Sequence, residues 1–287
     1  MTAASFCGCS PSWPRTDRTT AMPTAKVNGL NLHYERAGAG ERLLFISGTG
    51  ADLRNKPNQM DGPLAGGFDM VSYDQRGLGQ SDKPDIRYTM ADYADDAAGL
   101  MDHLGWPDAK VIGVSFGGMV AQELVLRHPE KVSRLVLGCT SPGGAGGSSF
   151  PFHEIEHLKG EARARHLMPF SDTRMTPEWA AANPEAFARA LALSSAPDPH
   201  ADEPNRAIGA HRQLEARADH DVWDRLPQIA IPVMLAAGKF DGVAPPQSQL
   251  NLAMQIPGSV LQFFKGGHMF MLQDRAALPA IEAFLRG

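Results

Sequence analysis

The chain alternates short apolar runs with segments of helical periodicity. Apolar residues dominate both faces of three early runs, at 43–46, 109–115 and 132–140. Such runs are typical of strands in a parallel sheet that helices cover on both sides. Because the segment 117–130 between the second and third runs has helical spacing, the order there is strand, helix, strand. This order predicts a doubly wound, mostly parallel α/β sheet with right-handed crossovers.

The other periodic segments extend this sheet to about eight strands. Residues 25–36 alternate around Asn28-Gly29, a dipeptide that favours positive φ in a two-residue hairpin turn. The sheet therefore opens with an antiparallel pair. We expect further strands at 68–74, 232–238 and 259–264, and helices at 88–105, near 245–256 and in a closing segment that ends at Leu285.

The segment 142–225 interrupts this alternation. It opens with Pro142-Gly143-Gly144 and is then rich in Ala, Arg, His, Met and Pro, with helical patches. We therefore expect a helical cap inserted into an α/β core that consists of residues 22–141 and 226–287. Residues 1–21 mix Ser, Thr, Pro and scattered charge without an apolar stretch, which predicts a disordered tail rather than a secretory signal.

Charge and cysteine content argue against several partners and locations. The formal net charge of −5 disfavours nucleic acid or an anionic membrane as the main partner. No apolar stretch approaches the roughly 20 residues that a membrane-spanning helix needs. The cysteines are Cys7, Cys9 and Cys139, too few for a disulfide framework, so we expect a reducing, cytoplasmic location. The oligomeric state stays open.

One pentapeptide carries a chemical signature. Gly113-Val114-Ser115-Phe116-Gly117 matches G-x-S-x-G and stands where a predicted strand ends and a helix begins. A serine on so sharp a turn leaves no room for side chains two positions away, which explains glycine at both places. The turn lifts the hydroxyl clear of the sheet and beside the N-terminus of the next helix, where developing negative charge is stabilised. The motif predicts that Ser115 is a nucleophile.

The partners of such a serine are expected later in the chain, first an acid and then a histidine. Asp241 lies in a loop at the carboxyl edge of the predicted sheet, and the alternative loop, 140–149, contains no carboxylate. His268 lies in a Gly-Gly-His loop after the last strand. We expect His268 to act as general base and Asp241 to fix its tautomer. The oxyanion-hole donors are predicted to be the N–H groups of Phe116 and Thr49.

These stretches resemble the α/β-hydrolase superfamily, especially its 3-oxoadipate enol-lactonase-like serine esterases and lactonases. The resemblance rests on YDQRGLGQSD (73–82), the segment 113–137, GKFDGVAPP (238–246) and Gly266-Gly267-His268. It implies that a small-molecule carboxylic ester or lactone is cleaved through an acyl-enzyme, with no cofactor. One departure is Ser47, where relatives commonly have histidine before the oxyanion-hole glycine. Asp74 and Arg76 match a family motif, and we interpret them as loop architecture rather than chemistry.

A competing motif lies in the predicted cap. His153-Glu154-Ile155-Glu156-His157 matches H-E-x-x-H, in which two histidines one helical turn apart bind zinc beside a glutamate base. The segment is short, follows a proline and lies in the insertion rather than on a scaffold helix. We therefore interpret it as a solvated helix face and expect no metal site.

Several activities share the predicted triad. C–C bond hydrolases and cofactor-free haloperoxidases or perhydrolases use the same constellation, and the sequence does not separate them from esterases. A non-catalytic, receptor-like member of the fold is disfavoured because serine, acid and histidine are all present. In the predicted cap, Met168, Phe170 and Trp179 suggest an apolar roof over a substrate pocket.

Overall fold

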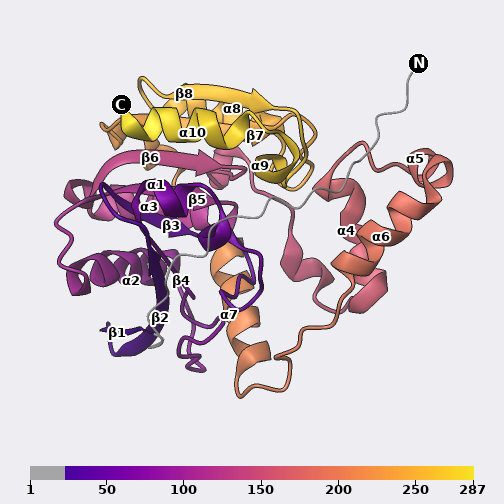
Figure 1. The fold of residues 1–287 in the computed structure, drawn as a ribbon, viewed down its shortest axis with the longest axis horizontal. Helices are drawn as coiled ribbons and strands as arrows, with labels where there is room; N and C mark the ends of the chain where they lie inside the picture. Colours follow the sequence, from indigo (N-terminus) through magenta and orange to yellow (C-terminus); the bar gives the residue numbers. More distant parts are fainter. Residues whose placement is uncertain (1–22) are drawn as a thin grey trace.

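Within residues 23–287, which the computed structural model describes, eight strands form one sheet in the order β1-β2-β4-β3-β5-β6-β7-β8 (Figure 1). β2 pairs antiparallel with β1 and β4, and the other neighbouring strands are parallel. The tail predicted at 1–21 lies outside the described residues. The strands are β1 (Thr24–Val27), β2 (Leu30–Ala37), β3 (Arg42–Ile46), β4 (Asp69–Tyr73), β5 (Ala109–Val114), β6 (Val132–Gly138), β7 (Val233–Gly238) and β8 (Val260–Phe264). The predicted α/β-hydrolase fold is confirmed.

The first two strands form the hairpin that the sequence predicts. Asn28 and Gly29 both have positive φ, 51° and 81°, and Val27 pairs with Leu30 across the turn. Two residues with positive φ give the turn the twist that adjacent antiparallel strands need. The Asn-Gly dipeptide therefore fixes the register of this edge of the sheet.

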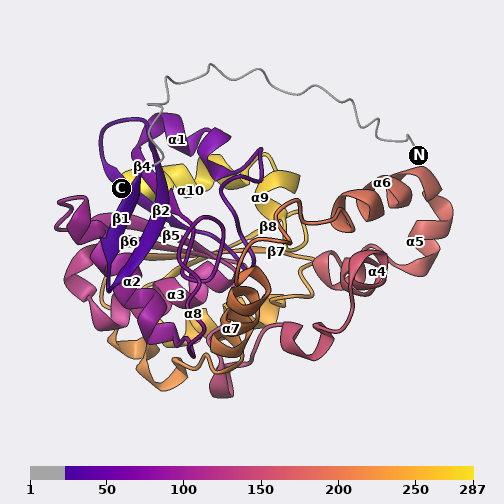
Figure 2. The ribbon, with the colours of Figure 1, turned by 90° about the horizontal axis from the view of Figure 1, so that it is seen from below.

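Helices cover both faces of the sheet (Figure 2). One hydrophobic cluster lies under α2, α3 and α8, and a second lies under α1, α9 and α10. Because both faces are covered, the central strands β3 to β7 are apolar on both sides, which explains their unbroken apolar runs. These helices are α1 (Leu64–Gly67), α2 (Met90–His103), α3 (Phe116–Arg127), α8 (Pro246–Gln255), α9 (Phe270–Gln273) and α10 (Ala277–Arg286).

The segment predicted as a cap contains two differently placed groups of helices. α4 (Gly160–Ser171), α5 (Pro177–Ala182) and α6 (Pro184–Ser194) lie to one side of the sheet in Figure 1. α4 and α6 share a small hydrophobic cluster of Ala164, Met168 and Leu191. α7 (Arg206–Ala218) instead contacts core loops, since the Gln213 side chain accepts a hydrogen bond of 2.9 Å from the N–H of Gly50. Part of the insertion is thus tied to the core by polar contacts.

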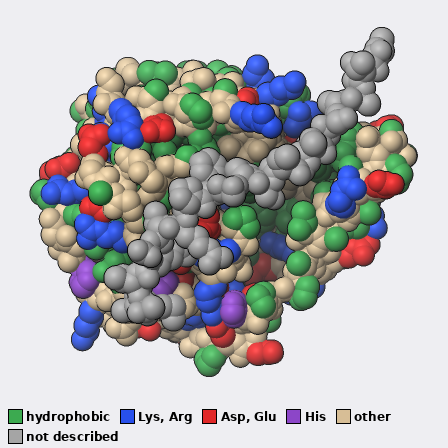
Figure 3. All heavy atoms as spheres, viewed as in Figure 1, with side chains coloured by type: hydrophobic (Ala, Val, Ile, Leu, Met, Phe, Trp, Pro, Cys, Tyr) green, Lys and Arg blue, Asp and Glu red, His purple; other side chains and the backbone are tan. Residues whose placement is uncertain are grey.

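Charges of both signs are intermixed on the face shown in Figure 3. Within the part of the chain that the structure describes, no helix is both long enough and apolar enough to cross a membrane. The exposed large hydrophobic side chains are Ile86, Leu193, Leu250, Met254, Val260, Met269 and Leu272. They are distributed over several elements, as is usual for a protein surface.

The loop after β4 is held by two buried charged residues. Asp74 accepts hydrogen bonds from the backbone N–H groups of Leu53 and Gln80, at 2.8 and 2.9 Å. Arg76 forms two hydrogen bonds with Asp96 of α2, at 2.6 and 2.8 Å, and both side chains are almost completely buried. These contacts support the interpretation of Asp74 and Arg76 as loop architecture.

Removing Asp96 should destabilise the fold strongly. In Asp96→Ala the guanidinium of Arg76 stays buried and keeps only the more exposed Asp92, at 3.4 Å, as a counter-charge, so we expect a loss of about 3 kcal/mol in the free energy of unfolding. Asp102→Ala, on the same helix, removes an exposed carboxylate paired with Lys131 and should cost less than about 1 kcal/mol. Urea denaturation of the three proteins measures both values. Equal losses in the two variants would contradict this account.

Candidate active site

Ser115 occupies a strained turn between β5 and α3. Its backbone has φ 56° and ψ −117°, a conformation that side-chain-bearing residues rarely adopt. A Cβ at Gly117 would lie 2.0 Å from the carbonyl oxygen of Ile46, and one at Gly113 would lie 2.3 Å from the carbonyl oxygen of Gly117. Both glycines of the G-x-S-x-G motif are therefore required by backbone crowding, as predicted.

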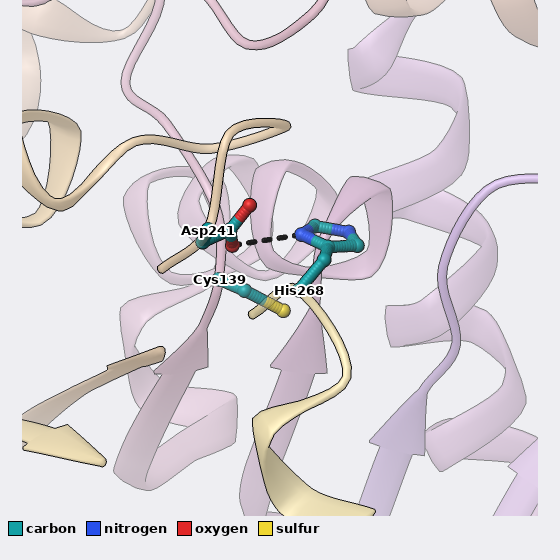
Figure 4. A group of neighbouring side chains, drawn as sticks. All are labelled: Cys139, Asp241 and His268. Atoms are coloured by element: carbon teal, nitrogen blue, oxygen red, sulfur yellow. Dashed lines mark hydrogen bonds and ion pairs between the residues drawn. The ribbon is translucent and has the colours of Figure 1, made fainter. Parts of the chain in front are cut away.

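Ser115, His268 and Asp241 form a chain of hydrogen bonds. The distance from His268 Nε2 to Ser115 Oγ is 3.0 Å, and that from His268 Nδ1 to Asp241 Oδ2 is 2.8 Å. Figure 4 shows the second contact, with the carboxylate in line with the imidazole edge. The other oxygen of Asp241 accepts from the N–H groups of Val243 and Ala244, at 2.8 and 2.9 Å. These bonds fix the carboxylate and aim it at the ring.

The end of α4 holds the two loops that carry Asp241 and His268. The carbonyl of Ser171 accepts a hydrogen bond from the N–H of His268 at 2.7 Å, and the carbonyl of Phe170 accepts one from Gly242 at 2.8 Å. A Cβ at Gly267 would lie 2.2 Å from the same Ser171 carbonyl. The insertion therefore orients the His268 loop through hydrogen bonds between backbone groups. The sequence does not indicate this role.

Cys139 lies close to the hydrogen-bonded residues Ser115, His268 and Asp241, and the sequence analysis did not identify it. It directly follows β6, with φ 40°, is buried, and its sulfur points toward the imidazole of His268 (Figure 4). Among residues 23–287, Cys139, Asp241 and His268 make up the single group of three potential metal ligands, with ligand atoms within 4.8 Å of one another. Cys139 directly precedes the loop 140–149, which was considered for an alternative acid, so the ionisable side chain at the start of that loop was the signal that could have identified it.

The surroundings raise the pKa of His268 above its ordinary value of 6.5. Burial works in the opposite direction because it disfavours the charged imidazolium. Contact with Cys139 and the hydrogen bond to Asp241 favour the charged form and outweigh the burial. The imidazole is thus a stronger proton acceptor than a free histidine.

The two predicted oxyanion donors come from segments that adjoin Ser115. Phe116 is the first residue of α3, so its N–H lacks an acceptor within the helix. Thr49 follows Gly48, where an added Cβ would lie 3.4 Å from Ser115 Cβ and 3.9 Å from its Oγ. Ser47 takes part in a polar network, with its hydroxyl contacting the Gln59 amide at 3.1 Å. The loop is therefore held without the histidine that relatives commonly have.

The three predicted pocket residues do not form one surface. Met168 is buried in the small cluster shared by α4 and α6, and Trp179 lies on α5, at the far end of the insertion in Figure 1. Phe170 packs against Phe150 with ring centroids 4.5 Å apart and the rings tilted, and its carbonyl binds the loop of Asp241. Of the three, Phe170 alone is tied to that loop, and its contact with substrate stays a prediction.

The H-E-x-x-H segment does not form the helix that the zinc motif requires. Residues Phe152–Ile155 form a short 3-10 helix, and an α-helix begins only at Gly160. Glu156 instead pairs with His211 of α7, with 2.9 Å between Nδ1 and the carboxylate. The two histidines are therefore not presented one turn apart on an α-helix.

Comparison with known proteins agrees with this geometry. A family model described as the α/β hydrolase fold matches residues 41–274. The chain belongs to this α/β-hydrolase family. Its relatives include the Mycobacterium tuberculosis protein named "Putative non-heme bromoperoxidase BpoC", 30% identical over 252 residues, which span 84% of this chain and 91% of that protein. The 3-oxoadipate enol-lactonase 2 of Acinetobacter baylyi is 27% identical over 273 residues, 92% of this chain and 96% of the enzyme.

A solved structure gives the same result for this α/β hydrolase. The enol-lactonase from Burkholderia xenovorans LB400 superposes with a TM-score of 0.73 at 25% identity, covering 92% of this chain and all of that one. The fold and the predicted resemblance to enol-lactonases are thereby confirmed. The relatives carry differently named activities, so membership establishes a hydrolase family without fixing a substrate.

The pKa of His268 can be measured directly by NMR titration. We expect a value above 6.5 in the natural sequence. Cys139→Ala should lower this pKa, because it removes a neighbour that favours the imidazolium. Cys139→Ser retains a polar atom at the site and should shift the pKa less. A His268 pKa that is the same in all three proteins would show that the sulfur does not act on the ring.

Proposed function

We propose that this α/β hydrolase cleaves a carboxylic ester or lactone, with Ser115 as nucleophile, His268 as general base and Asp241 as the residue that orients and stabilises the imidazole. The observation that carries the proposal is the unbroken hydrogen-bond chain from Asp241 through His268 to a serine on a strained turn. Strain is tolerated where it presents a reactive group. The names of the enol-lactonase relatives support a lactone or a related ester as substrate.

The proposed reaction proceeds through an acyl-enzyme. Ser115 Oγ attacks the carbonyl carbon while His268 Nε2 accepts its proton, and the N–H groups of Phe116 and Thr49 stabilise the oxyanion. The C–O bond then breaks, and the leaving alkoxide takes the proton from His268. Water attacks the acyl carbon and transfers a proton to His268, which returns it to Ser115 Oγ as the acid is released.

A second candidate is a perhydrolase or haloperoxidase activity. It is favoured by the 30% identity to the bromoperoxidase-named relative from M. tuberculosis. Hydrogen peroxide would attack the same acyl-enzyme in place of water and release a peracid. Product analysis with and without peroxide separates the two, since a hydrolase yields the carboxylic acid and a perhydrolase yields the peracid.

Ser115→Ala should abolish the reaction without unfolding the protein. We expect kcat on a panel of esters and lactones to fall by roughly 10⁴ to 10⁶, as in other triad knockouts. Labelling by a serine-directed fluorophosphonate should also be lost. The matched control is Ser133→Ala, which removes an exposed serine of β6 and should leave both readouts unchanged. Covalent labelling that persists in a folded Ser115→Ala protein would identify another nucleophile.

Asp241→Asn tests the orienting acid through both rate and pH dependence. Hydrolysis requires neutral His268, so activity should fall as pH drops through its raised pKa. Without the carboxylate this acid limb should move to lower pH, and kcat should drop by roughly 10⁴ because the wrong tautomer is permitted. Asp219→Asn, which removes a carboxylate exposed beside Arg87, is the control and should leave rate and profile unchanged. An unchanged pH profile in Asp241→Asn would reject its assigned role.

A further inference from the structure

Arg217 of α7 is a buried arginine without a carboxylate partner. It is 6% exposed, and its Nη1 and Nη2 donate to the hydroxyls of Thr49 and Ser149, at 3.0 and 2.7 Å. Its Nε has no acceptor, and no carboxylate of residues 23–287 lies within 4.0 Å of its guanidinium. Burying a guanidinium without a counter-charge opposes folding.

Two other arginines, one buried and one partly buried, are paired with carboxylates. The guanidinium of Arg76 binds Asp96 through two nitrogens. Arg206, 13% exposed, binds both Asp52 and Asp198. Arg217 has only neutral hydroxyls and the ring of Phe152, whose centroid is 4.8 Å from its Cζ. No carboxylate of the described residues therefore pairs with its charge, which leaves the guanidinium available to an anionic ligand.

Arg217 also lines a small cavity that lacks acidic residues. The cavity measures about 80 Å³, and its polar lining includes Ser141, Ser149, His153 and His220. Burial lowers the pKa of His220 to about 4, so this imidazole is neutral at pH 7. Burial also lowers the pKa of Arg217, to about 10, which leaves the guanidinium charged at pH 7. The fixed charge of the cavity wall is thus positive.

The guanidinium is linked to the proposed catalytic centre through the loop of Gly48 and Thr49. Its Nη1 binds the hydroxyl of Thr49, whose neighbour Gly48 lies against Ser115. Cys139 and Asp241, both of which adjoin His268, act electrostatically on Arg217 in the direction that favours its charge. A ligand held by Arg217 would therefore lie near the loop that faces the reacting serine.

We propose that Arg217 binds a carboxylate of the substrate, so that the preferred substrates are acidic esters or lactones. A guanidinium suits this task because its planar set of N–H donors matches a carboxylate. The hydroxyl of Ser149 supplies a further donor at the same place. This inference rests on the proposed ester hydrolysis for its kinetic test, whereas the binding of the anion can be measured separately.

The kinetic test compares two 4-nitrophenyl esters whose distal carboxyl group is either free and charged or methylated and neutral, 4-nitrophenyl hydrogen glutarate and 4-nitrophenyl methyl glutarate. The natural protein should have the higher kcat/KM for the acidic ester. In Arg217→Met we expect this preference to fall by about 10- to 100-fold, mainly through KM, the range for a hydrogen bond to a charged group. Arg217→Lys should retain part of the preference because it keeps the charge.

The control variant is Arg212→Met on the same helix. Arg212 is partly exposed and already paired with Asp85 and Glu215, so its removal should leave the preference for the acidic ester unchanged. Circular dichroism establishes that each variant is folded. A preference that is the same in Arg217→Met and the natural protein, or no preference in the natural protein, would overturn the inference.

Binding without turnover separates this inference from the proposed function. Glutarate should raise the melting temperature of the natural protein and of Ser115→Ala, whereas dimethyl glutarate should not. Arg217→Met should lose most of this shift, and Arg217→Lys, which serves as the test if Arg217→Met does not fold, should keep only part of it. If the fluorophosphonate fails to label Ser115 but the glutarate shift depends on Arg217, ester hydrolysis is wrong and the anion site stands. Labelling without any glutarate shift would reject the anion site alone.

Discussion

The reversal of the chain at Ser115 is the constraint on which the rest of the site depends. A residue with positive φ ends β5 and begins α3 without an intervening loop, so the helix starts in contact with the sheet. That contact leaves no space for a side chain at Gly117, which faces the carbonyl oxygens of Ile46 and Ser47. The serine is held by its neighbours, since its N–H donates to Gly138 and its carbonyl accepts from Thr140. Packing on three strands thus compensates for the backbone strain.

The remaining groups reach Ser115 because parallel strands end at one edge of the sheet. β7 delivers Asp241 and β8 delivers His268, while the residue after β6 places the Cys139 sulfur beside the imidazole. Close approach of these loops is again permitted by glycine, because a Cβ at Gly238 would lie 2.0 Å from the carbonyl oxygen of Gly267. Backbone carbonyls at the end of α4, in the insertion, accept hydrogen bonds from the loops of Asp241 and His268.

Two buried arginines of this fold differ in their partners, and we assign a structural role to one and a ligand-binding role to the other. Arg76 is neutralised by Asp96 and stacks near Tyr88 and Tyr93, which serves only the architecture of the loop after β4. Arg217 is equally buried, yet its guanidinium meets only hydroxyls and lines a cavity without acidic residues. Natural proteins tolerate such unfavourable groups where a ligand completes them. The cavity wall thus carries the charge of Arg217 without a carboxylate partner, whereas the buried charge of Arg76 is paired with one.

The sequence by itself determined the sheet and the turn at Ser115, and it singled out Asp241 and His268 as the partners of that serine. Apolar runs, the Asn28-Gly29 turn and the G-x-S-x-G glycines are local signals, because each reflects burial or backbone conformation within a few residues. Only the tertiary structure decided the contacts of Cys139, the backbone hold of α4 on the histidine loop and the isolation of Arg217. These depend on which side chains approach from distant parts of the chain. An arginine in a helix looks the same in sequence whether or not a carboxylate faces it after folding.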